Sequence, residues 1–374
     1  MKICHIVAYV SSDGAYGGPT TVAFAQCQAL QAGHEVTLLA GWDGKAQAGG
    51  TDGIRRIYKR AFRPLSSFGS LFSPGLLWWL LRNGRSFDLC HIHLARDFTV
   101  MPAALLCRLL SVPYVIQTHG MIRTPSGLAG RAYDRFLTFP ALRGARRSFY
   151  LTTEEHTDLS AMPGHPPFEQ VRNAVPVPPV PSRPAGPAER VNVLYCSRMH
   201  SRKRPALFVD MALELEERAA AAFGFSMVGP DGGELRRVED AIAAAPAAVQ
   251  LTYDGAVPPE AVARILGETD ILVLPSINEP FPMIVLEALS MAVPVVVDST
   301  SGLAGILADR PGARVVDSTP KSLADAVQDL SKDLAAEREA ARSIAHEEFS
   351  LRRLARQLDA AYADSLPPAA AQRS

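Results

Sequence analysis

The sequence predicts an α/β protein of two doubly wound units, each built around a parallel sheet with helices on both faces. Strand-like and helix-like runs alternate along the chain, which is the pattern of repeated βαβ units. A proline-rich segment at residues 175–187 interrupts this alternation near the middle of the chain. The length of 374 residues also favours two domains over one, since a domain has roughly 100–200 residues.

The first unit is expected at residues 1–182. Its predicted strands are the apolar runs 2–9, 34–40, 88–93 and 113–118, followed by a weaker run at 147–151. Its predicted helices are 19–32, 70–83 and 99–110. In a doubly wound sheet, ligands bind at the carboxyl ends of the strands, so the loops after these strands are the places to search for chemistry.

The segment 175–187 is expected to be an extended linker between the units. Six of its thirteen residues are proline, a density that neither a helix nor a central strand tolerates. The alternation restarts after it, and the second unit is expected at residues 183–350. Its predicted strands are 191–196, 223–228, 249–253, 270–275 and 294–298. A basic helical pattern over 351–368 is expected to pack back on the first unit.

Charge and cysteine content exclude several classes of protein. The chain has 38 basic and 38 acidic residues, which argues against a generally cationic nucleic-acid-binding protein. Residues 1–182 nevertheless carry a net charge of +7, and residues 183–350 carry −9. The five cysteines are scattered and form no CxxC pair, which argues against a disulfide scaffold or a cysteine zinc site and favours a reducing, cytoplasmic location.

No apolar run reaches the roughly 18 residues of a membrane-spanning helix. The nearest candidate is Leu71–Leu81, which contains Trp78 and Trp79. This segment is expected either to be a buried helix or to lie on a membrane surface.

Two glutamates flank a predicted helix start in the second unit. The sequence Glu279-Pro-Phe-Pro-Met-Ile-Val-Leu-Glu287 follows an apolar strand. Pro282 suits the first helical position, and the amides of Met283 and Ile284 would then be donors for an anion. This layout suits a sugar nucleotide, and two surface glutamates around a loop would explain the pattern equally well.

A basic cluster follows the first strand of the same unit, in Cys196-Ser-Arg198-Met-His-Ser-Arg202-Lys203-Arg204-Pro205. Arg198 and Lys203 would be exposed cations at a strand end, where they can neutralise a diphosphate. A solvated basic run is the alternative. No two aspartates are spaced i, i+2, so the chain lacks a DxD metal clamp for a diphosphate, and no metal site is predicted.

The first unit offers two candidate loops. Gly17 and Gly18 follow its first strand, and glycines allow close approach of the backbone to a ligand, although the sequence is not GxGxxG. His119 directly follows the strand 113–118, and a lone histidine of this kind is more commonly structural. His91 and His93 alternate on one strand face, without evident partners for a metal site.

Together these motifs resemble glycosyltransferase family 4, whose members have the GT-B fold of two Rossmann-like domains facing a central cleft. The resemblance covers nearly the whole chain. It rests on Gly17-Gly18, Thr118-His119-Gly120, Arg198 with Lys203, and above all the block Pro275-Ser276, Glu279, Glu287-Ala288 and Pro294-Val295-Val296. Asn173-Ala-Val and Val228-Gly229-Pro-Asp231-Gly232 are also similar to family segments.

The resemblance implies a hexosyltransferase that moves a sugar from a nucleotide sugar to a polysaccharide, glycolipid or lipid-linked acceptor. It further implies retention of the anomeric configuration and no essential metal or cofactor. Arg198 and Lys203 would hold the diphosphate, Glu287 the ribose and Glu279 the donor-sugar hydroxyls, while His119 would contact the sugar beside the reacting carbon. The remaining donor-binding residues would be Gly17, Gly18, Phe281, Met283 and Ile284.

The chain departs from the family at Pro282, Ala292 and Ala174, where glycine is usual. The sequence also leaves two other functions open on the same frame. One is a sugar-nucleotide epimerase or a phosphorylase, and an epimerase would turn over the donor without an acceptor. The other is a non-catalytic nucleotide-sugar binding protein, which the joint presence of both cations and both glutamates argues against.

The basic first unit predicts a peripheral contact with an anionic membrane, at the inner face of the cell membrane, or with a lipid-linked acceptor. Arg143, Arg146 and Arg147 cluster in the sequence, and Trp78 and Trp79 supply amphipathic rings. A soluble acceptor and an ordinary basic surface are the alternative.

Overall fold

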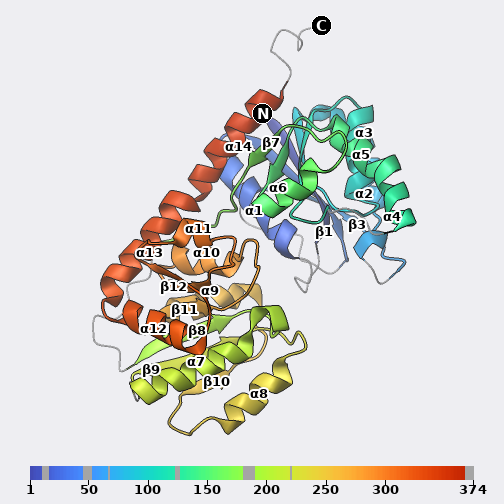
Figure 1. The fold of residues 1–374 in the computed structure, drawn as a ribbon. Coiled ribbons are helices and arrows are strands. Elements are labelled where there is room, and N and C mark those ends of the chain that lie inside the picture. Colours follow the sequence, from blue (N-terminus) through green and yellow to red (C-terminus); the bar gives the residue numbers. More distant parts are fainter. Residues whose placement is uncertain are drawn as a thin grey trace. The chain divides into compact units, whose positions relative to one another are not determined.

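The computed structural model describes residues 1–10, 17–44, 53–65, 68–122, 127–179, 190–219 and 221–366 (Figure 1). By its internal contacts the chain divides into two compact units. Unit 1 consists of Met1–Ala174 together with Leu351–Ser374, and unit 2 consists of Val175–Ser350. Each unit contains one sheet in which all strands are parallel, which confirms the predicted fold class.

The sheet of unit 1 has the strand order β3-β2-β1-β4-β5-β6-β7. Its strands are β1 (Lys2–Val10), β2 (Glu35–Trp42), β3 (Arg55–Arg60), β4 (Leu89–His93), β5 (Tyr114–Gln117), β6 (Ser148–Tyr150) and β7 (Phe168–Gln170). The edge strands β3 and β7 are not among the strands predicted from the sequence. β3 reads Arg-Arg-Ile-Tyr-Lys-Arg and lacks an apolar run, and charged side chains are common on an edge strand.

Helices cover both faces of this sheet, because alternate side chains of its central strands are apolar on both sides. The helices are α1 (Gly17–Leu30), α2 (Pro74–Asn83), α3 (Val100–Leu109), α4 (Leu128–Tyr133), α5 (Phe139–Gly144), α6 (Thr153–Ser160) and α14 (Leu351–Ser365). Cys4 and Ile6 of β1 pack with α2 and α3, whereas Ile3 and Val7 pack with α1 and α14. Short turns lie at Phe68–Ser70, Gly84–Ser86 and, as a π-helical turn, Asp134–Thr138.

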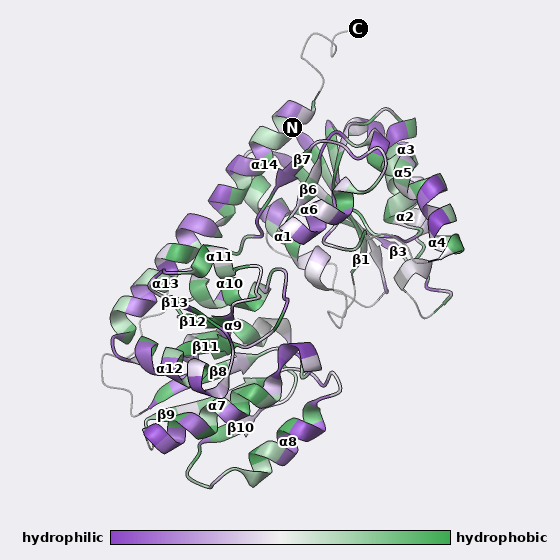
Figure 2. Ribbon diagram, viewed as in Figure 1, coloured by the Kyte–Doolittle hydropathy of each residue, from purple (hydrophilic) through white to green (hydrophobic). Residues whose placement is uncertain are grey.

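Unit 2 repeats the pattern with the strand order β10-β9-β8-β11-β12-β13. The strands are β8 (Val191–Cys196), β9 (Phe223–Val228), β10 (Leu251–Tyr253), β11 (Ile271–Leu274), β12 (Val295–Asp298) and β13 (Ala313–Val316). The order reverses between β8 and β11, and in doubly wound sheets ligands commonly bind beside the carboxyl ends of the strands at such a reversal. β11 and β12 are among the hydrophobic parts of the ribbon, whereas α8 and α14 carry hydrophilic stretches (Figure 2).

The helices of unit 2 form two apolar layers with its sheet. They are α7 (Pro205–Arg218), α8 (Leu235–Ala244), α9 (Pro259–Glu268), α10 (Met283–Ser290), α11 (Ala304–Leu307), α12 (Pro320–Ser331) and α13 (Leu334–Glu348), with a 3₁₀ turn at Ser201–Lys203. One layer contains Phe208 and Leu215 of α7, and the other contains Leu286 and Leu289 of α10. Each such side chain, once fully buried, contributes roughly 1.5–3 kcal/mol.

The chain leaves unit 1 earlier than the sequence suggested. We expected the boundary between residues 182 and 183, and the structure places it between Ala174 and Val175. Val175 is buried in the core of unit 2, and its amide donates a hydrogen bond of 2.9 Å to the carbonyl of Phe349. The first part of the proline-rich segment therefore belongs to unit 2, and residues 180–189 lie outside the described ranges.

The chain returns to unit 1 at Leu351, where α14 begins. Leu354, Leu358 and Tyr362 are buried in the same core as residues of α1 and β1. In the described parts of the chain, no helix is long and apolar enough to cross a membrane.

Candidate functional site

The loops at the carboxyl edge of the unit 2 sheet are joined by backbone hydrogen bonds. The Ile277 amide after β11 donates to the Arg202 carbonyl after β8 at 3.0 Å, and the Gly302 amide after β12 donates to the Glu279 carbonyl at 2.8 Å. A Cβ atom on Gly302 would lie 1.9 Å from the Pro280 carbonyl oxygen, so only glycine fits there. These contacts fix the loop that carries Glu279 against the loop that carries Lys203.

Lys203 and Glu279 form an ion pair through Nζ and Oε1. The expectation that Lys203 is exposed is wrong, because its side chain is only 16% exposed and that of Glu279 14%. The second carboxylate oxygen of Glu279, Oε2, is buried and has no hydrogen-bond partner. A buried acceptor of this kind is costly unless a donor reaches it, and a hydroxyl group of a ligand or an ordered water can supply that donor.

Tyr195, near the end of β8, makes hydrogen bonds to the basic loop that carries Arg198 and Lys203. Its hydroxyl lies 3.3 Å from the carbonyl of Arg198 and 3.4 Å from that of Lys203, and it donates to these oxygens. Burial raises the pKa of Tyr195, and the nearby charge of Glu279 adds to the effect. The neutral phenol is therefore a fixed hydrogen-bond donor to the loop.

Arg198 is exposed and lies against the loop after β9. A Cβ atom on Gly232 would come within 2.7 Å of Arg198 Cγ, so glycine at this position leaves room for the arginine stem. The Gly232 amide also donates to the Met199 carbonyl at 2.9 Å. An exposed guanidinium on a fixed stem can bind a phosphate in a bidentate fashion.

α10 begins one residue later than predicted. Met283 is its first residue and Pro282 precedes it as the N-cap, so the predicted helical position of Pro282 is wrong by one residue. The Ile284 amide lies in the first turn, where an amide has no intrahelical acceptor and favours an anion. Phe281 is half-buried and contacts the Phe349 ring edge-on, with ring centroids 6.1 Å apart, which anchors the start of α10.

Glu287 lies in the second turn of α10 and is partly buried. Burial raises its pKa to about 6. Its charge also contributes to the raised pKa of the Cys196 thiol, about 11, after the larger effect of burial, so the two side chains are close. Glu287 therefore lies beside the end of β8, where it can accept hydrogen bonds from a ligand.

The family departure at Ala292 coincides with an unusual backbone. Ala292 follows α10 with φ of 57°, in the left-handed region that favours glycine. Ala174 is buried at the end of unit 1.

The predicted residues of unit 1 lie at the carboxyl ends of β1 and β5. α1 starts at Gly17, and a Cβ atom on Gly18 would meet nothing within 4 Å, so the space beside Gly18 is open. Gly14, which precedes this pair in the sequence, lies outside the described residues. His119 is partly exposed, with φ of 51°, and its Nε2 lies 2.8 Å from His93 Nδ1.

Glu155, which holds the turn around His119, is not among the site residues predicted from the sequence. Glu155 of α6 is buried, and its Oε1 accepts hydrogen bonds from the Thr118 hydroxyl at 2.6 Å and the Gly120 amide at 2.8 Å. Its Oε2 accepts one from the Leu151 amide at 2.7 Å. The sequence gives no sign of this, because Glu155 resembles an ordinary first-turn glutamate.

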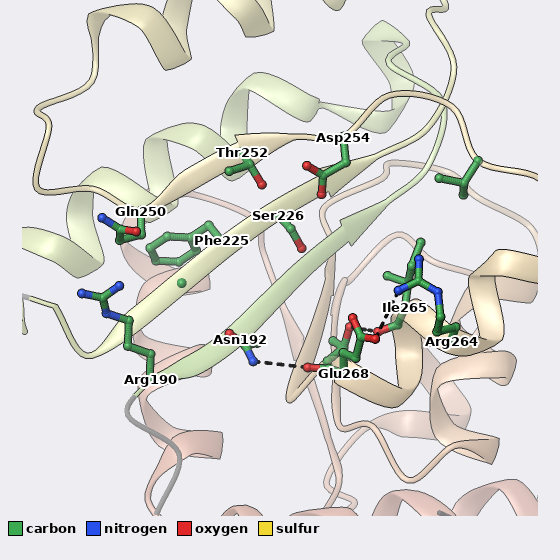
Figure 3. Close-up of a pocket in the computed structure, with 13 residues that line it drawn as sticks. Arg190, Asn192, Phe225, Ser226, Gln250, Thr252, Asp254, Arg264, Ile265 and Glu268 are labelled. Carbon is green, nitrogen blue, oxygen red and sulfur yellow. Dashed lines mark hydrogen bonds and ion pairs between the residues drawn. The ribbon is translucent and has the colours of Figure 1, made fainter. Parts of the chain in front are cut away.

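Among the described residues, no group of three or more His, Cys, Asp or Glu side chains is arranged to hold a metal ion. A pocket of about 610 Å³ in unit 2 lies on the polar side of β8, β9 and β10 (Figure 3). Asn192, Ser226 and Thr252 line it, together with Arg264 and Glu268 of α9, whose side chains are 3.2 Å apart. None of the predicted site residues lines this pocket.

Two family models together span most of the chain. Residues 17–174 match the glycosyl transferase 4-like domain, and residues 183–347 match the glycosyl transferases group 1. The chain is a group 1 glycosyltransferase with the GT-B fold. The matches follow the two units of the structure and favour a transferase over an epimerase, a phosphorylase or a binding protein.

Curated relatives named as glycosyltransferases are similar to much of this chain, and a solved structure shares its fold. The chain is 25% identical over 288 residues to the alpha-D-kanosaminyltransferase of Streptomyces kanamyceticus, covering 70% of this chain and 74% of the relative. It is 27% identical over 237 residues to the 2-deoxystreptamine N-acetyl-D-glucosaminyltransferase of Streptomyces fradiae, covering 58% and 56%. The structure of Anabaena HepE in complex with UDP and glucose matches with a TM-score of 0.69 at 16% identity, over 97% of this chain and 99% of the other.

The raised pKa of Glu287 predicts that Glu287→Gln makes the glycosyltransferase more stable at neutral pH. The folded-state pKa of about 6 lies above the ordinary value of 4.5, so the stabilising contribution of the protonated acid is complete below about pH 4.5 and is lost as the pH rises through 6. The gain from the amide should therefore grow between these values and reach about 2 kcal/mol above pH 7. Chemical unfolding from pH 4 to 8 measures it.

Glu339→Gln is the matched control, because Glu339 is an exposed glutamate of the same unit. Its replacement should change the free energy of unfolding little, because an exposed side chain makes few contacts. A pH-independent difference between Glu287→Gln and the unmodified protein would contradict the assignment of a buried, destabilising carboxylate.

Proposed function

We propose that this glycosyltransferase moves a sugar from a nucleoside diphosphate sugar to an acceptor hydroxyl, with retention of the anomeric configuration and without a metal ion. The observation that carries the proposal is the arrangement at the carboxyl edge of the unit 2 sheet. There the Lys203–Glu279 pair, the exposed Arg198 and the start of α10 lie at the point where the strand order reverses. The UDP and glucose bound to Anabaena HepE are consistent with such a donor.

The charges of these residues suit the parts of a nucleotide sugar. Arg198 and Lys203 would hold the diphosphate, together with the amides of Met283 and Ile284 at the start of α10. Glu287 would accept hydrogen bonds from the ribose hydroxyls. Phe281 would contribute to the donor site because it fixes the start of this helix.

Glu279 would bind the donor sugar. Its buried Oε2 lacks a donor in the structure, and a sugar hydroxyl would supply one. From unit 1, Gly17 and Gly18 would bring backbone near the phosphates, and His119 would contact the sugar beside the reacting carbon. Preorganised positive charge at the departing diphosphate would be the main source of rate acceleration.

Two positive side chains and the start of α10 would neutralise the negative charge of the diphosphate in place of a metal ion. A divalent ion there would be repelled by Arg198 and Lys203. We therefore expect transfer to proceed unchanged in a chelator and to give a product with the donor's anomeric configuration. Assays with a panel of nucleotide sugars, followed by proton NMR of the first-formed product, measure both.

The two halves of this prediction can fail separately. Activity lost in EDTA and restored by magnesium or manganese would contradict metal-independent transfer. An inverted product would contradict the assignment of retention and the sugar-binding roles of His119 and Glu279. Donor turnover without transfer to any acceptor would instead favour an epimerase or a hydrolytic activity.

We further propose that unit 1 contacts an anionic membrane from the cytoplasmic side and takes a lipid-linked acceptor there. α2 and α3 form an apolar groove of about 480 Å³, in which Trp78 is 55% exposed and Leu109 is 74% exposed. Neither helix carries an acidic residue, and Arg82 lies over the Trp78 ring at 4.4 Å. An apolar surface with a basic border suits the interface of an anionic bilayer.

Arg147 is less suited to this contact than expected, because it pairs with Glu169 at 2.7 Å and lies 3.6 Å from Asp364. The free cysteines, four of them buried, are consistent with a reducing cytoplasmic location. The Streptomyces fradiae relative is named for 2-deoxystreptamine, so a small, lipid-free acceptor is the alternative that an experiment must separate.

Sedimentation with phosphatidylglycerol vesicles tests the membrane contact. The protein should bind at low salt and be released at high salt, and Trp78→Ala with Leu109→Ala should weaken binding by about tenfold or more, because two large apolar surfaces are lost. Leu128→Ala, which removes an exposed leucine of α4, is the matched control and should bind normally. Absence of binding at low salt would contradict the proposal and favour the lipid-free acceptor.

A further inference from the structure

A chain of hydrogen-bonded histidine rings lies behind His119 in unit 1. His93 Nδ1 lies 2.8 Å from His119 Nε2, and His93 Nε2 lies 3.3 Å from His5 Nδ1. The His93 and His119 rings are stacked, with centroids 5.1 Å apart. His5 and His93 are fully buried in β1 and β4, whereas His119 is partly exposed. The chain therefore leads from the sheet interior to a ring that a ligand can reach.

The three rings are neutral at physiological pH. Burial lowers the pKa of His5 and of His119 to about 3 and that of His93 well below its ordinary value. Other uncharged polar side chains are buried beside these rings in the part of unit 1 that the structure describes. They include His91, which is 2.6 Å from the Tyr362 hydroxyl, and the pair Gln26 and Gln117, joined at 2.8 Å. A neutral imidazole carries one proton, on either of its nitrogens.

Because His93 has one N–H, its two hydrogen bonds must run in the same direction. In the first arrangement His5 Nδ1–H donates to His93 Nε2, and His93 Nδ1–H donates to His119 Nε2. In the reverse arrangement His119 Nε2–H donates to His93, which donates to His5 Nδ1, and the proton of His5 then lies on Nε2. His5 Nε2 is buried without a hydrogen-bond partner. The reverse arrangement would bury an N–H with no acceptor, which is rarer in proteins than an unpaired acceptor.

We propose that His93, supported by His5, is a positioning residue that fixes His119 as the tautomer with its proton on Nδ1. That nitrogen is then a hydrogen-bond donor toward a substrate oxygen. The backbone of the turn is fixed separately, since Glu155 holds Thr118 and Gly120 on either side of His119. The inference rests on the proposed role of His119 at the donor sugar. It assigns to the buried side chains of His93 and His5 the role of setting which nitrogen of His119 carries the proton.

Two substitutions of His93 separate this role from simple packing. In His93→Asn the side-chain amide lies where Nδ1 was and can still donate to His119, whereas in His93→Gln it lies where Nε2 was and reaches only His5. We expect His93→Gln to lower kcat by at least about tenfold with little change in the donor KM, and His93→Asn to restore most of it. His91→Gln, in the same strand and equally buried, is the matched control and should keep kcat.

The tautomer itself is read by long-range ¹H–¹⁵N NMR of histidine-labelled protein, with His119→Gln to identify the His119 signals. We expect the proton on Nδ1 in the unmodified protein and in His93→Asn, and a shift toward Nε2 in His93→Gln. A proton on Nε2 of His119 in the unmodified protein would overturn the proposal, as would equal losses of kcat in His93→Gln and His91→Gln. The NMR result does not depend on activity, so it stands even where the proposed transfer reaction fails.

Discussion

The ion pair between Lys203 and Glu279 is the interaction on which the proposed chemistry of this glycosyltransferase depends. Each charge is mostly buried, and each is acceptable there because the other is present. Removal of either partner alone would leave a buried charge unpaired, at a cost of about 1–3 kcal/mol or more. A bound diphosphate would give Lys203 a second partner, and a bound sugar would give Glu279 a second partner. The pair would therefore form the binding site for the nucleotide sugar before that substrate binds.

The sheet of unit 2 makes this pair possible. β8 and β11 are neighbours at the reversal of strand order, so the loops that follow them begin side by side, and a hydrogen bond from the Ile277 amide to the Arg202 carbonyl joins them. The Tyr195 hydroxyl donates to the loop after β8, and the close approach of Gly302 to Pro280 fixes the loop after β11. Neutral groups hold the two loops in place, and the Lys203–Glu279 pair joins them.

Much of this could be predicted from the sequence. Alternating apolar runs gave all the central strands, and the positions of Arg198, Lys203, Glu279 and Glu287 after strands placed them at one edge of one sheet. Edge strands such as β3 were missed because charged residues replace the apolar pattern there. The burial of Lys203 was missed because a local sequence does not show which loop packs against it.

The supports of His119 could not be predicted for the same reason. Glu155 and His93 act through contacts with residues 37 and 26 positions away along the chain, and nothing in their immediate sequence distinguishes them from an ordinary glutamate and an ordinary strand histidine. Only the packing of α6 and β4 around the His119 turn brings them together. Buried polar contacts of this kind are specified by tertiary structure rather than by local pattern.

Calorimetry with free UDP, GDP and ADP tests most directly whether Lys203 and Glu279 have separate tasks. Lys203→Met should weaken binding of the preferred diphosphate by about tenfold or more, since a charge-assisted contact is lost. Glu279→Gln should leave that affinity within about threefold, because the diphosphate alone lacks the sugar that Glu279 holds. The double variant, which leaves no charge unpaired, should bind as weakly as Lys203→Met. Equal losses in the two single variants would contradict the account.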